Sequence, residues 1–394
     1  MVGLNTRLTD LKTKFGQYFS AGPDVVVNSP GRAEIIGNHT DYNLGYALGC
    51  AISQSTLGLF KKRVDKKIII RSTHPDFHEK ISFSLNQINR DKTIKWGNYA
   101  RGVVNELLKL NYPLTGAEIL VDTNFSTSGG LSSSAALELC LAYGLMALAK
   151  QTIDPETIAP ACQRAENSRL VMSPCGFLDQ AVIAFSQKDK MVLLDFAPPV
   201  KFKLIPAALA TLDVSLVVVV DKTVKRVLGE SGYPARRKMC ESACKTLKIS
   251  SLRKLSISDF VAKKNRLEPV TRQRVEHIVY ENQRVLDAVT ALENNNVVKF
   301  GRLLNQSGRS ALDLYGLAEN TPELRYLLES AQNLDGVLGT RNMGGGFSAI
   351  ILALVKNKSL AAFRLQLQNQ YQQKFSGSLE FVRFTPSQGV KLLL

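Results

Sequence analysis

The chain has 394 residues, of which 45% are hydrophobic and 21% are charged, a balance typical of folded globular proteins. This length favours two domains over one, and this composition excludes long disordered regions. No run of about 18 uncharged apolar residues occurs, so we expect no membrane-spanning helix and no membrane partner. The formal net charge of +16 would suit an anionic partner, but the lysines and arginines are scattered without interleaved aromatic residues. We therefore expect no nucleic-acid partner.

The N-terminal segment and the cysteines lead us to expect a cytoplasmic protein. Residues 1–19 carry apolar side chains at helical spacing with lysines between them, which predicts an amphipathic helix rather than a signal peptide. The six cysteines form no CxxC pair, and Cys240 and Cys244 lack a nearby histidine that would complete a zinc site. We interpret most of the cysteines as small apolar core residues of a reduced protein.

Strands and helices alternate in the first part of the chain, and helices dominate later. The expected strands there are 24–28, 46–61, 67–72, 80–84, 116–124, 190–196 and 214–221. The expected helices there are 96–110, a run that begins near residue 133, and 154–170. From about 232 to 321 the pattern is almost entirely helical, and the longest periodic run is 268–293. The last elements are strands at 337–343, 347–355 and 379–384, with a helix at 360–375. This order predicts an α+β protein in two lobes.

Three glycine-bearing motifs carry the candidate chemistry. The first is GNHTDYNLG (37–45), which follows SPGRAEII and places an amide, an imidazole, a hydroxyl, a carboxylate and a phenol close together. The second is SGGLSSSAA (128–136), whose free backbone N–H groups and following helix would suit a bound phosphate. A serine-rich helix cap is an equally good interpretation of that motif alone. The third is RNMGGGF (341–347), a glycine-rich turn between two expected strands.

Taken together, in this order and at these distances, the three motifs resemble those of the GHMP small-molecule kinases. The closest likeness within that superfamily is to the galactokinases, and it extends from residue 30 to residue 389. Further stretches that support it are WGNYARGV, CQRAENSRL, SPCGFLDQ, SGYPARRKMCE and TPSQG. The resemblance implies a two-lobed GHMP kinase fold. Residues 1–205 would form an N-terminal lobe on a mixed sheet. Residues 206–394 would form a ferredoxin-like C-terminal lobe of helices and sheet, whose final strand can return to the first lobe.

The resemblance also implies the reaction and its catalytic residues. Galactokinases transfer the γ-phosphoryl group of ATP to the C1 hydroxyl of galactose. Asp179, in SPCGFLDQ, matches the catalytic aspartate that accepts or orients the hydroxyl proton. Arg32 matches the arginine that lies close to this aspartate and favours a more acidic sugar hydroxyl. Such a reaction depends on positioning and on charge stabilisation.

ATP and Mg²⁺ would bind residues of the second motif by the same likeness. Ser134 and Glu166 match the serine and glutamate that hold magnesium between the β- and γ-phosphates, and hard oxygen ligands suit that ion. Trp96 and Tyr99 are expected to flank the adenine, although plain core packing is nearly as good an interpretation. The residues expected to line the phosphate loop are Ser128, Gly129, Gly130, Leu131, Ser132, Ser133 and Ser134.

The first motif would bind the sugar. By the resemblance, Asp41 accepts hydrogen bonds from the C3 and C4 hydroxyls, His39 lies near C6, Gly176 belongs to the pocket, and Tyr233 closes over the sugar. Asn38 departs from the family, because galactokinases usually carry a glutamate here that binds the C6 hydroxyl. An amide can still donate and accept. Our hypothesis from the sequence is that loss of a negative charge weakens the exclusion of sugars altered at C6, such as uronic acids.

Three other functions remain open at this stage. One is a sibling sugar-1-kinase for galacturonate, arabinose or N-acetylgalactosamine. Another is a non-catalytic sugar sensor on the same fold, which should lack a catalytic residue; the presence of Arg32, Asp179 and Glu166 favours catalysis. The third is a basic nucleic-acid-binding module, which would need a localised cationic stripe. We expect the protein to act as a monomer on a monosaccharide and ATP.

Overall fold

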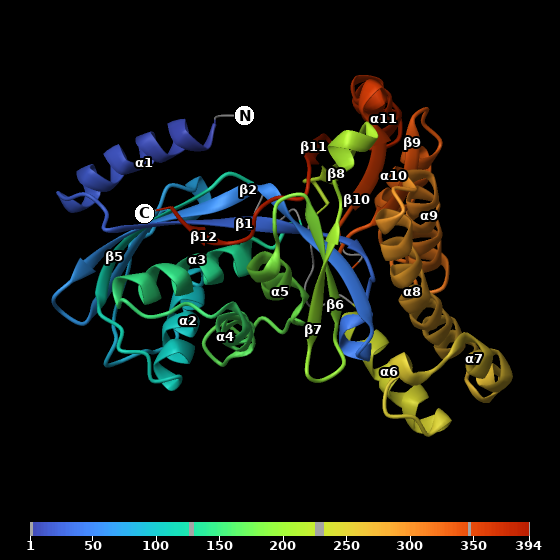
Figure 1. The fold of residues 1–394 in the computed structure, drawn as a ribbon, viewed down its shortest axis with the longest axis horizontal. Coiled ribbons are helices and arrows are strands. Elements are labelled where there is room, and N and C mark those ends of the chain that lie inside the picture. Colours follow the sequence, from blue (N-terminus) through green and yellow to red (C-terminus); the bar gives the residue numbers. More distant parts are fainter. Residues whose placement is uncertain (1–2, 126–129, 225–231, 346–347, 394) are drawn as a thin grey trace.

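The computed structural model describes residues 3–125, 130–224, 232–345 and 348–393, and these form the predicted α+β arrangement. Figure 1 shows two parts, each built on its own sheet, joined where the long strands of the first sheet reach the second. Within the described residues the first sheet has eight strands and the second has four. Of the helices in those ranges, none has the length and apolar character needed to cross a bilayer.

The first sheet is mixed. Its path runs β12-β1-β2-β5-β3-β4, and β6 pairs with β2 and with β7. All of these pairs are antiparallel except β3 with β5. The strand bounds are β1 Val25–Ile36, β2 Tyr46–Arg63, β3 Lys67–Ser72, β4 Ile81–Ser84, β5 Gly116–Thr123, β6 Lys190–Asp195, β7 Lys201–Pro206 and β12 Lys391–Leu392. Because β12 pairs with β1, the last strand of the chain lies at the edge of the first sheet.

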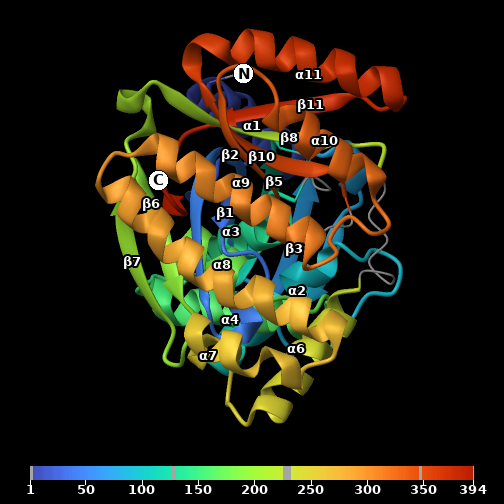
Figure 2. The same ribbon diagram turned by 90° about the vertical axis from the view of Figure 1, so that its right-hand side faces the viewer.

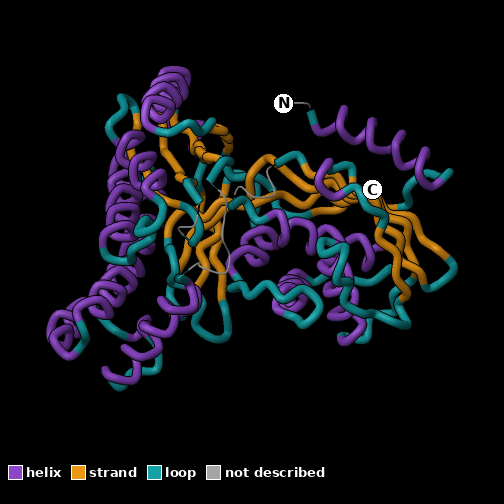
Figure 3. The backbone as a smooth tube through the Cα atoms, turned by 180° about the vertical axis from the view of Figure 1, so that it is seen from behind, coloured by secondary structure: helices purple, strands orange, loops and turns teal. Residues whose placement is uncertain are grey.

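Helices cover both faces of the first sheet, as Figures 1 and 3 show from opposite sides. One face carries α1, whose Leu11 and Phe15 pack on β2 and β5. The other face carries four helices, of which α3 is the most deeply buried. The bounds of these helices are α1 Leu4–Phe19, α2 Gly97–Lys109, α3 Ser133–Leu148, α4 Pro155–Asn167 and α5 Leu178–Phe185. The second part of the molecule contacts the strands β1, β2 and β7 of this sheet.

The second sheet is antiparallel, in the order β11-β8-β10-β9, and follows the β-α-β-β-α-β pattern of ferredoxin-like folds. In β8, Leu216 and Val218 join the core shared with the first sheet, whereas Val217 and Val219 face the helices. Both faces are thus buried, which explains the unbroken apolar sequence of this strand. The strand bounds are β8 Val214–Asp221, β9 Val337–Asn342, β10 Ile350–Lys356 and β11 Leu379–Phe384.

Figure 2 looks onto the helical layer of this second part, where α8 and α9 lie side by side. α8 is the longest helix in the described ranges and corresponds to the longest periodic run of the sequence. Its inner face contributes Val285 and Leu292 to the core shared with the first sheet. The bounds of the helices are α6 Tyr233–Leu247, α7 Ile257–Lys263, α8 Pro269–Glu293, α9 Val297–Asp313, α10 Pro322–Gln332 and α11 Leu360–Lys374.

The structure differs from the sequence-based expectation mainly around β1. We expected a strand that ended at residue 28, whereas β1 continues to Ile36. The Pro-Gly pair after residue 29 is accommodated by an irregularity between Pro30 and Arg32, and a second lies between Glu34 and Ile36. Such bulges let a strand tolerate residues that normally end one, and they redirect side chains. The short helix α5 and the edge strand β7 were not predicted.

All six cysteines are free thiols, in agreement with the expectation of a reduced protein. Those at 50, 140, 162 and 240 are buried, whereas Cys175 and Cys244 are half-buried. Cys240 and Cys244 both lie on α6, and no group of three or more histidine, cysteine or acidic residues in the described part of the chain is arranged to hold a metal ion.

Candidate active site

The first motif forms the connection between β1 and β2, at the end of the first sheet that meets the second. Gly37 has φ +111°, and a Cβ there would overlap the backbone of Ala47, so this turn needs glycine. His39 has φ +62°, which is uncommon for a residue with a side chain. Thr40 closes the turn, since its hydroxyl donates to the Gly37 carbonyl at 2.7 Å. The polar side chains of the motif are therefore held on a tight, strained loop.

Arg32 and Asp179 meet although they are far apart in the sequence. Nε of Arg32 donates to Oδ1 of Asp179 at 2.8 Å, and Nη2 lies 2.7 Å from the same oxygen. Arg32 comes from β1, and Asp179 occupies the first turn of α5, where the helix dipole favours a carboxylate. Nη1 of Arg32 also donates to the Gly130 carbonyl at 2.6 Å. The structure thus brings the two predicted catalytic residues together, directly beside the second motif.

The second motif caps α3. Ser132 is the residue before the helix and has left-handed backbone angles, φ 58° and ψ 54°. Its hydroxyl donates to Oδ2 of Asp179, so both oxygens of that carboxylate are held. The Arg32 N–H donates to the Leu131 carbonyl at 3.1 Å, which fixes the loop against β1. The helix N-terminus and its serines therefore lie next to the Arg32–Asp179 pair. Ser128 and Gly129 lie outside the described residues.

A cavity of about 420 Å³ adjoins these serines. Trp96, Tyr99, Ser133 and Ser134, all predicted to contact the nucleotide, line it together. Sequence reasoning missed the other residues of its wall, because most of them come from loops and strands without a motif. Those residues are Ser72, His74, Phe77, Arg90, Lys95, Asn98, Val121, Thr123, Leu137 and Val171. Two cations, an aromatic cluster and a helix N-terminus make this cavity suitable for a planar ring that carries phosphates.

Two buried carboxylates, Glu138 and Glu166, lie near the N-terminal half of α3. Glu138 and Glu166 share one amide, because Nε2 of Gln180 donates to Oε2 of both, at 3.0 and 2.8 Å. Burial raises the pKa of Glu166, and the negative charge of Asp179 adds to this; its hydrogen bond with Ser134 acts in the opposite direction. Burial and then the charge of Glu166 raise the pKa of Glu138 well above its usual range. The largest contributions to these two pKa values are burial and neighbouring carboxylates, and hydrogen bonds act against them.

This carboxylate cluster suits a hard divalent cation. Ser134 and Glu166 are in contact, as their predicted joint role requires. Oε1 of Glu138 is buried and has no hydrogen-bond partner, which an additional cation or water would supply. Mg²⁺ usually takes only one or two protein carboxylates, together with water and substrate phosphates. The oxygen donors present therefore fit this ion. Sequence reasoning missed Glu138, although its position four residues after Ser134 places both side chains on one helical face.

Asp41 lies against Gly176 at the sugar-binding end of the site predicted from the sequence. A Cβ at position 176 would overlap Oδ2 of Asp41, so only glycine permits this approach. Burial raises the pKa of Asp41 to about 6. A hydrogen bond from the Tyr42 backbone lowers this pKa, and the charges of Glu34 and Asp179 raise it further. Asp41 therefore shares a small acidic space with both of those carboxylates, between the first motif and the catalytic pair.

His39 is buried beside aromatic rings. Its Nδ1 lies 3.0 Å from the hydroxyl of Tyr42, and its ring centroid lies 4.9 Å from that of Tyr315. Burial lowers the pKa of His39 well below its usual range, and the charge of Arg236 adds to this. The imidazole is therefore neutral at physiological pH. Tyr233, predicted to close over the sugar, begins α6, but its side chain lies outside the part that the structure describes.

The side chain of Asn38 is committed to the protein. It is 2% exposed, and Nδ2 donates to Oε1 of Glu34 at 3.2 Å and to the Gly344 carbonyl at 3.1 Å. Its Oδ1 accepts from Nδ2 of Asn342 at 3.3 Å. Glu34 is also paired with Arg341, at 3.2 Å. The hypothesis about sugars altered at C6 stays a prediction, and the structure adds that the carboxylate of Glu34 lies directly beside the amide of Asn38.

A buried glutamate of α8 supports the first motif from behind. Oε1 of Glu281 accepts from the Gly37 N–H at 3.0 Å and from the Ser307 hydroxyl at 2.6 Å. Its Oε2 accepts from Nε of Arg284 at 2.7 Å. Burial alone would raise the pKa of Glu281, but the charges of Arg284, His277 and Arg341 lower it to about 2. Glu281 lies 244 positions from Gly37, and no sequence signal linked them.

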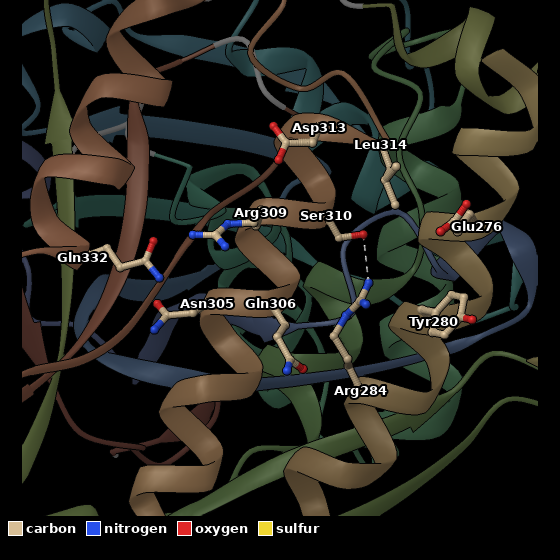
Figure 4. Close-up of a pocket in the computed structure, with 10 residues that line it drawn as sticks. All are labelled: Glu276, Tyr280, Arg284, Asn305, Gln306, Arg309, Ser310, Asp313, Leu314 and Gln332. Atoms are coloured by element: carbon tan, nitrogen blue, oxygen red, sulfur yellow. Dashed lines mark hydrogen bonds between the residues drawn. The ribbon is translucent and has the colours of Figure 1, made fainter. Parts of the chain in front are cut away.

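Arg284 also borders a second cavity, of about 440 Å³, on the outer surface between α8 and α9. Figure 4 shows its guanidinium pointing toward Ser310, with which it forms a hydrogen bond of 3.1 Å. Tyr280, Gln306 and Arg309 also line this cavity. None of the predicted site residues lines this cavity, so the candidate active site is the region around Arg32 and not this outer cavity.

Comparison with known proteins adds family relationships to this geometry. The model described as a galactokinase galactose-binding signature matches residues 13–62. The models for the N-terminal and C-terminal domains of GHMP kinases match residues 98–187 and 288–373. A galactokinase of Roseiflexus sp. is 35% identical over 367 residues, which cover 92% of this chain and 91% of that protein. A galactokinase of Staphylococcus carnosus is 32% identical and covers 98% and 99%.

Solved structures agree with these relationships. The crystal structure of Lactococcus lactis galactokinase complexed with galactose matches with a TM-score of 0.91 and 32% identity, over 98% of this chain and 99% of that chain. Mevalonate kinase of Methanococcus jannaschii matches with a TM-score of 0.62 and 17% identity, over 92% and 98%, and so shares the fold. Together with the family models, these matches confirm the predicted two-lobed GHMP kinase fold.

Proposed function

The chain belongs to the galactokinase family of GHMP kinases, and we propose that it transfers the γ-phosphoryl group of ATP to the C1 hydroxyl of galactose, giving galactose 1-phosphate. The observation that carries this proposal is the Arg32–Asp179 pair. It lies between the first motif, which bears the sugar-binding groups, and the N-terminus of α3, which opens into the cavity lined by Trp96. An acceptor hydroxyl and a terminal phosphate would meet there.

Asp179 is the proposed acceptor of the C1 hydroxyl proton. Each of its oxygens already accepts one hydrogen bond, from Arg32 and from Ser132, and each retains a lone pair for a hydroxyl. The two contacts fix the carboxylate plane, which is how a catalytic group keeps the geometry that the reaction needs. Arg32 places a permanent positive charge beside both the proton acceptor and the phosphate loop, where negative charge develops during transfer.

ATP is the proposed phosphate donor, with its base in the cavity of Trp96 and Tyr99 and its phosphates at the α3 N-terminus. We propose that Ser134 and Glu166 hold Mg²⁺, with Glu138 close behind them. When bound, this ion would neutralise part of the phosphate charge. Burial and neighbouring carboxylates raise the pKa values of both glutamates, and a bound cation would act in the opposite direction.

The sugar is proposed to lie on the first motif, with Asp41 accepting from its ring hydroxyls and His39 near C6. Gly176 supports this arrangement, since it allows the Asp41 carboxylate to lie toward the catalytic pair. We further propose that the protein acts as a monomer in the cytoplasm. Its six free thiols support the second point, and sedimentation analysis would test the first.

The test is an ADP-release assay with purified protein, Mg²⁺-ATP and a panel of galactose, arabinose, N-acetylgalactosamine and galacturonate. We expect galactose to give the highest kcat/KM, and phosphorus NMR of the product to show coupling to the C1 proton. Preferential turnover of another sugar in the panel would assign a sibling sugar-1-kinase instead. Binding of galactose in calorimetry, without ADP release for any sugar, would contradict the kinase proposal and favour a sugar sensor.

A further inference from the structure

Glu34 is a carboxylate in contact with Asn38 of the first motif, and no role has been given to it. It lies two residues after Arg32 on β1, and the pairing of both with β2 is regular, Arg32 with Ala51 and Glu34 with Gly49. Side chains two apart on a strand point to the same face. Since Arg32 points to Asp179, Glu34 faces the same space. Its charge also contributes to the raised pKa of Asp41, which places it within electrostatic reach of that group.

One oxygen of Glu34 is held and the other is available. Oε1 accepts from Nδ2 of Asn38 and from Nη2 of Arg341, each at 3.2 Å. Oε2 makes no hydrogen bond with any described residue, and it is not fully enclosed by protein. A carboxylate accepts hydrogen bonds with both oxygens. The free Oε2 therefore suits a hydroxyl donor of a ligand. The contacts with Arg341 and Asn38 hold the carboxylate of Glu34 in one orientation.

Asn38, by contrast, has little left to offer a ligand. Both protons of its amide are used, by Glu34 and by the Gly344 carbonyl, and its oxygen already accepts from Asn342. The likeness to galactokinases places position 38 at the C6 hydroxyl, where the family's glutamate acts. In this chain the carboxylate that the side chain of Asn38 contacts is that of Glu34, whereas Glu281 accepts only from the Asn38 backbone N–H. The chemistry usually supplied at 38 is thus supplied from 34.

On the basis of this geometry, and resting on the proposed function, we infer that Glu34 accepts the hydrogen bond of the C6 hydroxyl, and that Asn38 and Arg341 are positioning residues that hold its carboxylate. Galactose presents a neutral donor at C6. Galacturonate presents an anion there, which would meet the negative charge of Glu34 beside Asp41 and Asp179. The structure therefore assigns to this site a strong preference for neutral or cationic groups at C6 over carboxylates.

The first test needs only the unmodified protein. We expect kcat/KM to be at least tenfold lower for galacturonate than for 6-amino-6-deoxygalactose, and about tenfold to a hundredfold lower for 6-deoxygalactose than for galactose, as expected for loss of one hydrogen bond to a charged group. Efficient turnover of galacturonate, within threefold of galactose, would overturn the inference. Absence of galactose turnover would instead refute the proposed function on which it rests, so the two failures are distinguishable.

The second test uses the ratio of kcat/KM for galactose to that for 6-deoxygalactose, which does not depend on the fraction of folded enzyme. Glu34→Gln should lower this ratio at least fivefold. The double variant Glu34→Asn with Asn38→Glu moves the carboxylate to position 38 and should raise the ratio again. Glu106→Gln is the matched control, because Glu106 is also buried and paired with an arginine but does not line the cavity of Trp96 and Tyr99. A Glu34→Gln variant with the ratio of the unmodified enzyme would contradict the assignment.

Discussion

Two buried glutamates of this protein experience opposite electrostatic surroundings. Glu138, behind the phosphate-binding end, and Glu281, behind the first motif, are both 0% exposed. Burial and the charge of Glu166 raise the pKa of Glu138 well above its usual range. Burial acts in the same direction on Glu281, but Arg284 and other cations reverse it and lower the pKa to about 2. Burial is common to both, so the difference comes from the presence or absence of a fixed positive charge.

This difference distinguishes a glutamate that supports the structure, Glu281, from glutamates that can bind a ligand, Glu138 and Glu166. The charge of Glu281 is balanced by arginines of the protein, Arg284 and Arg341. Its carboxylate accepts hydrogen bonds from the backbone of Gly37 and the side chain of Ser307. It can be satisfied without any ligand. For Glu138 and Glu166 the largest charge contributions come from other carboxylates, and one buried oxygen of Glu138 has no hydrogen-bond partner among the described residues. A bound cation would offset this repulsion, as in a metal-dependent site.

The largest effect should follow from a change at the metal end. Glu166→Gln removes a proposed Mg²⁺ ligand while keeping a similar shape. We expect kcat/KM for Mg²⁺-ATP to fall about a hundredfold or more, and the Mg²⁺ concentration for half-maximal rate to rise about tenfold to a hundredfold. The measurement is an ADP-release assay across a Mg²⁺ titration. Glu106→Gln is the control, because Glu106 is a buried glutamate whose ion pairs are with Lys109 and Arg164 and not with a proposed Mg²⁺ ligand. An unchanged Mg²⁺ requirement in the Glu166 variant would contradict the assignment.

A change at the scaffold end should act on stability and on the sugar. Because the pKa of Glu281 in the folded state, about 2, lies below its ordinary value, its contribution to stability is present above about pH 4.5 and is lost as pH falls toward 2. We expect Glu281→Gln to lower the free energy of unfolding by roughly 3 kcal/mol at pH 7, from the size of the shift, and to flatten its dependence on pH between 5 and 3.

The same variant should raise KM for galactose more than KM for ATP, since Glu281 holds Gly37 and touches nothing in the nucleotide cavity. Chemical denaturation and steady-state kinetics measure these two effects. Equal changes in both KM values, or unchanged stability, would mean that the contrast between the two glutamates is not functional.

A third prediction concerns the pH dependence of sugar binding. The pKa of Asp41 is raised to about 6, so its carboxylate gains a proton and loses an acceptor as pH falls through that value. Galactose affinity should therefore decrease by up to about tenfold per pH unit below 6 and level off above 7. Calorimetry between pH 5 and 8 measures it. Asp41→Asn should bind more weakly but with a flat profile; an equally steep profile in that variant would assign the titration to another group.

The smallest effect is expected at Glu138. Its folded-state pKa is raised, so the stability that it contributes is greatest at low pH and is lost as pH rises toward the folded-state value. Without Mg²⁺, Glu138→Gln should therefore be neutral at pH 5 and stabilise the protein by about 1 kcal/mol at pH 8. Thermal unfolding in the presence of a chelator measures this. If Glu138→Gln instead destabilised the protein, and more so at higher pH, an unrecognised cation must already be paired with Glu138.

Sequence patterns predicted the catalytic end better than its support. Arg32, Asp179 and the serines of the second motif lie in short, distinctive stretches, and the fold only had to bring three such stretches together. Glu281 contacts Gly37 of the first motif from 244 positions away and stands in no motif. Arg341 begins the third motif, but nothing in that motif indicated its contact with Glu34, 307 positions away. Contacts of that kind depend on how the two parts of the chain pack. Local patterns in a single sequence do not show which distant residues will be in contact.

Other misses have local causes. The strand β1 was expected to stop early because Pro30 normally ends a strand, but a bulge accommodates it. α5 spans eight residues, too few for helical periodicity to be distinct, and β7 is an edge strand that is largely exposed. The hypothesis about Asn38 stays untested, but it considered one position alone, and the structure shows the carboxylate of Glu34 in contact with that side chain. A residue substitution is therefore best interpreted together with its neighbours in space.

The most direct test of the account is a comparison of the unmodified protein with Asp179→Asn, in galactose binding and in galactose-dependent ADP release. Asparagine keeps the shape and the contact with Ser132 but cannot accept the hydroxyl proton. The account predicts galactose affinity within about fivefold of the unmodified protein, and kcat reduced by about a thousandfold or more. If Asp179→Asn releases ADP at a rate within tenfold of the unmodified protein, the Arg32–Asp179 pair is not where phosphoryl transfer occurs.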